Sequence, residues 1–309
     1  MAMRIRVTTN AFSKNKILRK NLLSCFPNSK FNETGTRLTG DKLIKFLSDA
    51  DGAIIGLENI SSELLLKLPD LKIISTYGVG LDNIDFDACK IYNVEVGWSP
   101  GVNKLSVAEM TLGFMMNLSR NLQLTSNQLK NGLWNKSGGL QLSGKTIGII
   151  GLGHIGKELV RLLKPFNCQI LSYDIVDQIE FCEKQNVVIT SLKELLKKSD
   201  IVTIHTPLTS LTKGLVNKSF LSSMKKSSFL INTARGPIVI FKDLKYALSN
   251  SIISGAAIDV YDEEPPKDKE LLSLENLICT PHIGGNSFEA VISMGQSAID
   301  HLKTFFNKK

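Results

Sequence analysis

Residues 145–156 read KTIGIIGLGHIG, and KELVRLL (157–163) follows directly. The order is an apolar β-type run, a glycine turn and a helical pattern, which is the arrangement that receives a pyrophosphate at a helix N-terminus. In this arrangement Gly151 permits the tight turn, Gly153 lets the pyrophosphate approach bare backbone, and Gly156 lets the helix pack closely on the strand. The stretch therefore predicts a dinucleotide-binding unit of alternating strands and helices.

A carboxylate closes the next predicted strand. Asp174 follows the apolar run 169–173. Its distance along the chain from the glycine turn is close to the roughly 20 residues expected for the acid that bonds the adenosine ribose. The next residues are Ile175 and Val176 rather than Arg or Lys, so a 2′-phosphate would meet a negative charge and no cation. We therefore expect the cofactor to be NAD rather than NADP.

The same alternation of short apolar runs and helical periodicity extends over the whole chain, which predicts the α/β class with parallel sheets. Around the glycine turn we expect six strands, at 146–150, 169–173, 201–203, 229–232, 255–258 and 277–280. Before it we expect strands at 4–8, 53–57, 72–76 and 94–97, with helices at 14–25, 41–48 and 61–68. Two alternating series predict two domains.

A long helix is expected between the two series. Ser106 and Glu109 have the spacing of a capping box, with Ser106 as the N-cap, and the helix that it opens is expected to continue to about Trp134. A last helix at 287–306 follows the second series. We expect a substrate domain of residues 1–100 plus 286–309 and a nucleotide domain of residues 101–285.

Composition excludes several classes of protein. With 43% hydrophobic and 21% charged residues over 309 positions, the chain is expected to be globular and not disordered. Five scattered cysteines predict neither disulfides nor a metal site. The net charge of +8 is dispersed, so no nucleic-acid partner is expected, although it favours anionic substrates. No signal segment or long apolar run is present, so we expect a cytoplasmic protein without a membrane partner.

Three later segments place polar side chains after predicted strands, where ligands bind in open α/β sheets. They contain Arg235, Glu264 and His282. Each residue alone could have a purely structural role. Arg235 could form a surface ion pair, Glu264 could be one acid of an acidic loop, and His282 could be a turn residue. Together they offer a fixed cation for a carboxylate, a proton carrier that titrates near neutrality, and a carboxylate that orients it.

The motifs, taken in order, resemble those of the D-isomer-specific 2-hydroxyacid dehydrogenase family over nearly the whole chain. The matching stretches are STYGVGLDNID (75–85), SVAE (106–109), GKTIGIIGLGHIG (144–156), HTPLT (205–209), INTARG (231–236), AAIDVYDEEP (256–265) and TPHIGG (280–285). The forms GVGLDNID and SVAE are most similar to a short-form 3-phosphoglycerate dehydrogenase. That subtype oxidises 3-phosphoglycerate to 3-phosphohydroxypyruvate for serine biosynthesis.

The resemblance implies a fold and a set of site residues. The fold would be a flavodoxin-like substrate domain and a Rossmann-type NAD domain with the active site in the cleft between them, a C-terminal helix returning to the first domain, and a homodimer formed through the NAD domain. The implied catalytic residues are Arg235, Glu264 and His282. The implied substrate contacts are Val79, Gly80, Asn103 and Arg235. The implied cofactor contacts are Gly151, Gly153, His154, Ile155, Gly156, Asp174, His205, Thr206, Pro207, Thr233, Ala234, Asp259 and Gly284.

Three departures from the family pattern leave the substrate open. His154 stands where Arg is common, and Gln141 where many members have Glu. The segment 55–60 lacks the Arg and Ser/Thr that some phosphoglycerate dehydrogenases have there, which leaves Lys104 as the nearest candidate phosphate contact.

Other subtypes therefore stay open. They are a glyoxylate/hydroxypyruvate reductase and a D-lactate dehydrogenase, whereas formate dehydrogenases pair their histidine with Gln and are disfavoured. A different class is a non-enzymatic, NAD-sensing corepressor-like scaffold, which NADH turnover with 2-keto acids would distinguish.

Overall fold

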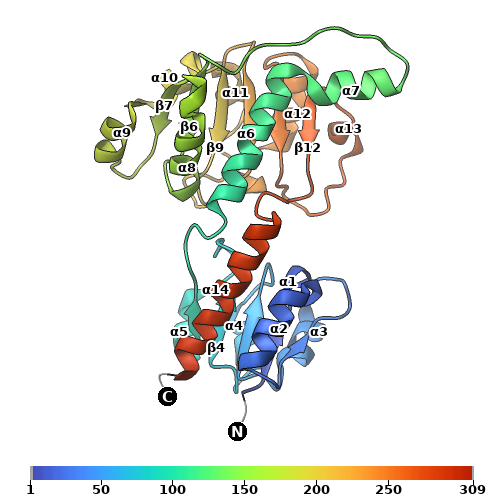
Figure 1. The fold of residues 1–309 in the computed structure, drawn as a ribbon, viewed down its shortest axis with the longest axis vertical. Helices are drawn as coiled ribbons and strands as arrows, with labels where there is room; N and C mark the ends of the chain where they lie inside the picture. Colours follow the sequence, from blue (N-terminus) through green and yellow to red (C-terminus); the bar gives the residue numbers. More distant parts are fainter. Residues whose placement is uncertain (1–2, 308–309) are drawn as a thin grey trace. The chain divides into compact units, whose positions relative to one another are not determined.

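The computed structural model describes residues 3–307, and these residues form two compact units (Figure 1). The first unit extends through Asn103 and resumes at Gly285, and the second is Lys104–Gly284. The chain thus passes between the units twice, at 103/104 and at 284/285. The expected boundaries were 100/101 and 285/286.

The first unit has a five-stranded parallel sheet in the order β2-β1-β3-β4-β5. Its strands are β1 (Ile5–Val7), β2 (Lys30–Phe31), β3 (Gly52–Ile55), β4 (Ile73–Thr76) and β5 (Glu95–Gly97). This is the strand order of flavodoxin-like sheets, which the family resemblance implied.

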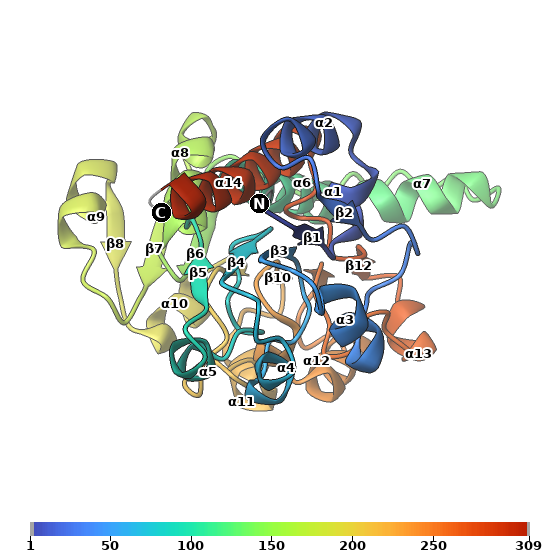
Figure 2. The ribbon, with the colours of Figure 1, turned by 90° about the horizontal axis from the view of Figure 1, so that it is seen from below.

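Helices cover both faces of this sheet, as Figure 2 shows from below. On one face lie α1 (Asn10–Lys14), α2 (Lys16–Cys25) and α14 (Phe288–Asn307); on the other lie α3 (Gly40–Leu47), α4 (Ser62–Leu66) and α5 (Phe86–Ile91). The core against α14 contains Ala298 and Leu302 of that helix together with Ile5 and Leu18, all fully buried. A fully buried leucine contributes about 1.5–3 kcal/mol, so α14 is an integral part of the first unit.

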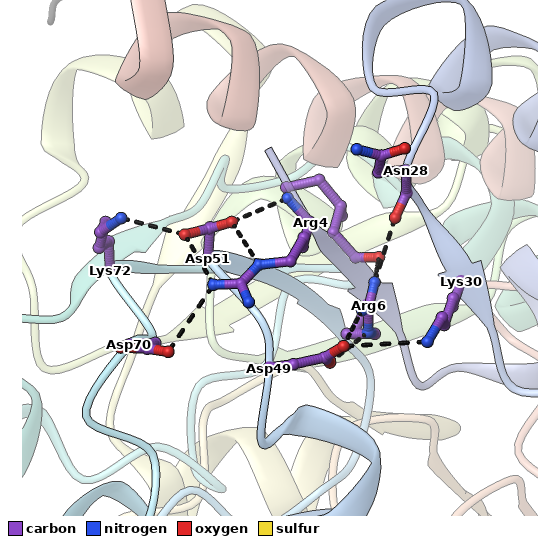
Figure 3. A network of polar contacts seen from close by, with 9 residues as sticks. Arg4, Arg6, Asn28, Lys30, Asp49, Asp51, Asp70 and Lys72 are labelled. Carbon is purple, nitrogen blue, oxygen red and sulfur yellow. Dashed lines mark hydrogen bonds and ion pairs between the residues drawn. The ribbon is translucent and has the colours of Figure 1, made fainter. Parts of the chain in front are cut away.

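A network of ion pairs joins the amino ends of the strands in the first unit (Figure 3). Arg6, almost fully buried, donates from Nε to Asp49 Oδ1 at 2.8 Å. Arg4 Nε and Lys72 Nζ each lie 3.1 Å from a carboxylate oxygen of Asp51. Burial alone would raise the pKa of the Asp51 carboxyl, but the hydrogen bonds from Arg4 and Lys72 bring it well below its ordinary value. Asp51 is therefore ionised and holds β1, β3 and β4 in register.

The second unit has a seven-stranded parallel sheet in the order β12-β11-β10-β9-β6-β7-β8. Its strands are β6 (Thr146–Ile150), β7 (Gln169–Tyr173), β8 (Val187–Ile189), β9 (Ile201–Ile204), β10 (Phe229–Asn232), β11 (Gly255–Ile258) and β12 (Leu277–Cys279). The order reverses between β6 and β9, which is the topological switch point of a Rossmann-type sheet. Both sheets confirm the predicted α/β class.

The helices of the second unit also lie on two faces (Figures 1 and 2). Long α6 (Lys104–Arg120) packs beside α8 (His154–Leu163) on one face. The other face is covered by α10 (Leu192–Lys198), α11 (Lys218–Ser223) and α12 (Phe241–Ser249). Short α9 (Ile179–Gln185) precedes β8, and α13 (Lys269–Leu272) precedes β12. In contrast, α7 (Leu122–Lys130) has no buried residue.

The structure corrects the predicted strand count. The sequence predicted six strands in the second series and missed β8, and in the first series it missed β2. Both are short strands at a sheet edge, and Val188 and Ile189 of β8 are each about half exposed. Such a strand has neither the length nor the buried apolar run by which strands are recognised.

The helix predictions need two corrections. The predicted helix from Ser106 to about Trp134 is two helices, because Asn121 has φ +53° in the left-handed region and ends the run after α6. Moreover α6 begins at Lys104, so Ser106 lies inside its first turn and is not the N-cap. The predicted helix 14–25 is likewise divided at Asn15, whose side chain caps α2 by accepting from Ile17 N and Leu18 N.

Candidate active site

Three adjacent strands of the second unit, β10, β11 and β12, lead into the loops that carry the candidate catalytic residues. Arg235 follows β10, Glu264 follows β11 and His282 follows β12. Because the carboxyl ends of neighbouring parallel strands meet at one edge of a sheet, the three loops are neighbours.

His282 and Glu264 form a direct pair. The His282 Nδ1 atom lies 2.9 Å from both carboxylate oxygens of Glu264, and Tyr261 N donates to Oε1 at 3.2 Å. Burial alone would raise the pKa of the Glu264 carboxyl, but the hydrogen bond with His282 and the charge of Arg235 bring it below its ordinary value. The carboxylate is therefore ionised beside the ring, and about a third of each side chain remains exposed.

The loop of Arg235 is held against the loop of Glu264 by a glycine. A Cβ atom at Gly236 would lie 2.1 Å from the carbonyl carbon of Tyr261 and 2.6 Å from Asp262 N, so only glycine allows this approach. Asn232 Nδ2 donates to Arg235 O at 2.9 Å, and Arg235 Nη1 donates to its neighbour's carbonyl at 2.7 Å. These contacts fix the guanidinium at the same edge of the sheet as the His282–Glu264 pair.

The glycine turn between β6 and α8 fits a pyrophosphate. Gly151 has φ +92°, and a Cβ atom there would lie 2.7 Å from His205 O; a Cβ atom at Gly156 would lie 2.4 Å from Gly151 O. At Gly153, within residues 3–307 and apart from its two chain neighbours, no atom lies within 4 Å of the Cβ position, so the backbone there is open to a ligand. His154 and Ile155 begin α8 directly behind this open position.

Asp174 lies at the end of β7 and faces the glycine turn. Its Oδ2 accepts from Leu152 N at 2.6 Å and its Oδ1 accepts from Val176 N at 2.9 Å. The side chains of Ile175 and Val176 are 76% and 61% exposed, and neither offers a positive charge. These two hydrogen bonds hold the carboxylate beside the glycine turn.

The segment after β9 adjoins the glycine turn from the other side. Burial lowers the pKa of His205 to about 3, so its ring is neutral, and Nε2 lies 3.0 Å from Thr203 Oγ1. Within residues 3–307, His205 Nδ1 and Thr206 Oγ1 are buried and have no hydrogen-bond partner. Two buried polar atoms beside the turn fit a polar ligand there, whereas the next residue, Pro207, is exposed.

Asp259 has a role that the sequence did not predict. The residue is 1% exposed, and its carboxylate accepts from Thr280 Oγ1 at 2.6 Å and from Ile283 N and Gly284 N at 2.8 Å each. The family resemblance implied that Asp259 contacts the cofactor. In the structure its carboxylate holds the loop that carries His282. Sequence reasoning also missed Thr280, although its place directly before Pro281-His282 was a signal.

Two further cofactor candidates are mostly enclosed by the second unit. Thr233 and Ala234 follow β10 and are 7% and 8% exposed. The Thr233 hydroxyl lies 3.4 Å from that of Thr111 on α6.

The candidate substrate contacts Val79, Gly80 and Asn103 belong to the first unit. Val79 and Gly80 follow β4, and Val79 O accepts from Trp98 Nε1 at 3.1 Å. Asn103 Oδ1 is buried and, in the described part of the chain, has no hydrogen-bond partner. This atom is therefore available to a polar ligand.

Glu58 marks the segment 55–60 as acidic. It is 3% exposed, and its Oε2 accepts from Gly56 N at 2.7 Å. Asn83 Nδ2 donates to the carbonyls of Gly56 and Glu58 at 3.2 and 2.6 Å, which joins this segment to the loop after β4. The candidate phosphate contact Lys104 instead lies 3.7 Å from Glu158 Oε2.

Two features are absent from residues 3–307. No group of three or more His, Cys, Asp or Glu side chains is arranged to hold a metal ion there. None of the helices in that range has the length and apolar character needed to cross a membrane.

Comparison with known proteins gives consistent matches. Residues 112–284 match the family model for the D-isomer specific 2-hydroxyacid dehydrogenase, NAD binding domain. D-3-phosphoglycerate dehydrogenase of Methanocaldococcus jannaschii is 37% identical over 275 residues, 88% of this chain and 52% of that protein. Glyoxylate reductase of Thermofilum pendens is 38% identical over 271 residues, 85% of this chain and 80% of that protein. The chain spans about half the length of the phosphoglycerate dehydrogenases that it matches.

A solved structure extends the likeness to the whole fold. D-lactate dehydrogenase from Aquifex aeolicus, complexed with NAD and lactic acid, superposes with a TM-score of 0.86 at 28% identity, over 99% of this chain and 96% of that one. The two parallel sheets, the glycine turn and the family model all indicate the same family. The chain belongs to the D-isomer specific 2-hydroxyacid dehydrogenase family of NAD-dependent oxidoreductases, and residues 112–284 are its NAD-binding domain.

Proposed function

We propose that this protein interconverts a D-2-hydroxy acid and the corresponding 2-oxo acid with NAD as the hydride carrier. The observation that carries the proposal is the His282–Glu264 pair, at 2.9 Å, beside Arg235 on the sheet edge of a dinucleotide-binding unit. A scaffold that only senses NAD has no need of this arrangement of an acid–base group, its carboxylate partner and a cation.

His282 moves the proton in this proposal. In the direction of reduction its protonated ring donates a proton to the C2 carbonyl oxygen, and in the direction of oxidation the neutral ring accepts the proton of the C2 hydroxyl. Glu264 stabilises the charged ring and fixes its orientation through Nδ1. Nε2 is the ring atom that we propose exchanges the proton with the substrate. His205 is excluded from this role because burial keeps it neutral.

Arg235 binds the carboxylate that every 2-hydroxy acid carries. Its planar guanidinium can offer two parallel hydrogen bonds, which Lys cannot reproduce. The backbone amides of Val79 and Gly80 and the side chain of Asn103 are the proposed further contacts of the substrate. These three residues belong to the first unit.

The proposed NAD contacts are those that the sequence implied, with one difference. Gly151, Gly153, His154, Ile155 and Gly156 would bind the pyrophosphate, Asp174 the ribose, and the segments at 205–207, 233–234, 259 and 284 the rest of the cofactor. When bound, the nicotinamide supplies or accepts the hydride. The difference is that Asp259 already holds three donors of this chain, so its main contribution is to the loop of His282.

Two substrate subtypes are supported by different observations. The motifs and the phosphoglycerate dehydrogenase relatives favour 3-phosphoglycerate. Glu58 favours a glyoxylate or hydroxypyruvate reductase, because a nearly buried carboxylate joined to the loop of Val79 repels a phosphate. D-lactate is the remaining proposed alternative.

One panel tests the function and the subtype together. NADH oxidation is measured with phosphohydroxypyruvate, hydroxypyruvate, glyoxylate and pyruvate, and a phosphoglycerate dehydrogenase has its highest kcat/KM with the first. A higher kcat/KM with hydroxypyruvate or glyoxylate would move the assignment to a reductase. Absence of turnover with all four would contradict the proposed activity and favour the scaffold.

The protein is proposed to form a homodimer through the NAD-binding domain. The support is an apolar surface on and after α7, where large side chains are between 48% and 75% exposed. These are Leu122, Leu129, Leu133, Trp134 and Leu140. Exposed apolar side chains in such number on one segment are typical of a surface that a partner covers.

Sedimentation tests this dimer. Trp134→Asp should convert the dimer to monomer at micromolar concentration, whereas Ile91→Asp, an equally exposed apolar residue of the first unit, should not. A monomeric unmodified protein would contradict the proposal.

A further inference from the structure

The loop 281–284 holds His282 in an unusual backbone conformation. Its φ is +53°, in the left-handed region, where a residue other than glycine costs on the order of 1–3 kcal/mol. Such a conformation persists only where surrounding contacts fix it. The neighbours of this loop therefore determine where the imidazole lies.

Asp259 fixes the N–H side of the loop. Its two carboxylate oxygens accept from Ile283 N and Gly284 N, the two amides that follow His282. Thr280 Oγ1, from the residue pair before the histidine, donates to the same carboxylate. Asp259 thus holds the chain on both sides of His282.

Ser106 fixes the carbonyl side. Its hydroxyl donates to Gly284 O at 2.6 Å, from the first turn of α6. Gly284 lies directly against the same helix, since a Cβ atom there would be 3.2 Å from Met110 Cε and 3.6 Å from Val107 Cγ2. Gly284 is therefore held through its N–H by Asp259, the residue after β11, and through its carbonyl by Ser106 of α6.

This role differs from the one that the sequence pattern indicated. In a capping box the Ser106 hydroxyl would accept from the amide of Glu109, but α6 begins two residues earlier, at Lys104. The hydroxyl instead connects α6 to the loop of His282, across 178 residues of sequence.

We propose that Ser106 is a positioning residue of the dehydrogenase: by holding Gly284 O while Asp259 holds Gly284 N, it keeps the His282 ring at the Glu264 carboxylate. The inference rests on the proposed function, since it assigns Ser106 an effect on the proton transfer that His282 performs. A serine that only stabilises α6 would affect unfolding and leave the catalytic constants in place.

Three variants test this with steady-state kinetics, using NADH and whichever 2-oxo acid of the panel has the highest kcat/KM. Ser106→Ala should lower kcat by about tenfold, the effect of one lost hydrogen bond, with KM for NADH within twofold. Ser106→Thr keeps the hydroxyl and should recover most of kcat. Ser119→Ala removes another buried serine of α6 and should change neither constant.

Amide hydrogen exchange gives a second measurement that needs no activity. In Ser106→Ala, peptides that contain Ile283 and Gly284 should exchange about tenfold faster than in the unmodified protein, while Ser119→Ala should leave them unchanged. Unchanged kcat and exchange in Ser106→Ala, or a fall in kcat that Ser106→Thr does not recover, would overturn the proposal. If the unmodified protein reduces none of the 2-oxo acids, the proposed function fails, and faster exchange would still support the hold on the loop.

Discussion

The Nδ1 atom of His282 is equidistant from the two carboxylate oxygens of Glu264, at 2.9 Å from each. The ring therefore cannot turn without losing both contacts, and its Nε2 is presented in one direction. Because Glu264 is itself held by Tyr261 N, the pair is fixed by backbone as well as by charge.

Replacing the histidine tests its role as acid and base. His282→Ala should lower kcat by roughly 10²- to 10⁴-fold with NADH binding little changed, because a positioned proton donor contributes that much. Steady-state kinetics and a fluorescence titration with NADH measure the two effects. His301→Gln is the matched control, since that ring bonds Ser99 in the first unit. Near-normal turnover in His282→Ala would refute the assignment.

Replacing the carboxylate should move the pH profile. Glu264→Gln removes the negative charge beside Nδ1, so the protonated ring becomes less stable. Reduction of a 2-oxo acid requires that protonated ring, and its rate should therefore begin to fall at a lower pH than in the unmodified enzyme. The check is kcat/KM for reduction between about pH 5 and 9; an unmoved limb would count against the pair.

Gly236 should not tolerate a side chain. Gly236→Ala would place a methyl group 2.1 Å from the Tyr261 backbone, so the loops of Arg235 and Glu264 must separate. We expect a lower melting temperature and a loss of activity. Gly113→Ala on α6, where nothing lies within 4 Å, should leave activity intact and stabilise the helix by about 0.5–1 kcal/mol. Equal behaviour of the two variants in thermal unfolding would contradict the argument.

Asp174 should determine the choice of cofactor. Asp174→Ala removes the ribose acceptor and the charge that repels a 2′-phosphate, so NAD affinity should fall by about tenfold while NADP gains relative to it. Asp177→Ala is a suitable control, because that exposed carboxylate accepts from Ile179 N, outside the glycine turn. The measurement is the Kd of NAD and of NADP for each variant. Equal Kd values for the two cofactors in the unmodified enzyme would contradict the role of Asp174 in cofactor choice.

The ion pairs of the first unit should make the free energy of unfolding depend on pH in the acidic range. The folded-state pKa of Asp51 is lowered, so its contribution is present above its unfolded pKa of about 3.9 and is lost as the pH falls through the folded value. Asp51→Asn should be less stable than the unmodified protein at pH 7, with the difference shrinking below about pH 4. Asp87→Asn, an exposed carboxylate of α5, should follow the unmodified protein. Urea denaturation at several pH values measures this, and a pH-independent difference would contradict it.

Most strands could be predicted from local sequence because runs of buried apolar residues carry a strong signal. Gly151, Gly156 and Asp174 marked the cofactor unit through fixed spacing and backbone requirements. Short edge strands such as β8 were missed because half-exposed side chains leave no apolar run. The break between α6 and α7 at Asn121 was not predicted either, because a residue with left-handed backbone does not interrupt the spacing of apolar residues.

The positions of the candidate catalytic residues after strands were predictable, but the contacts that hold their loops were not. Arg235, Glu264 and His282 stood in recognisable segments after strands. The partners of Asp259 and Ser106 depend on contacts between β11, α6 and the loop after β12, and long-range contacts of this kind leave no spacing in the sequence. A Ser–x–x–Glu pattern predicts a helix start equally well whether its hydroxyl caps the helix or bonds a distant carbonyl.

The place of α14 in the first unit also has a consequence for biosynthesis. Its Ala298 and Leu302 fill the core beside β1 and β4, yet the ribosome makes them only after the whole of Lys104–Gly284. The second unit can therefore fold while the first still exposes Ile5 and Leu18 to chaperones and proteases. In a nascent chain, the unit whose strands emerge first is the one completed last.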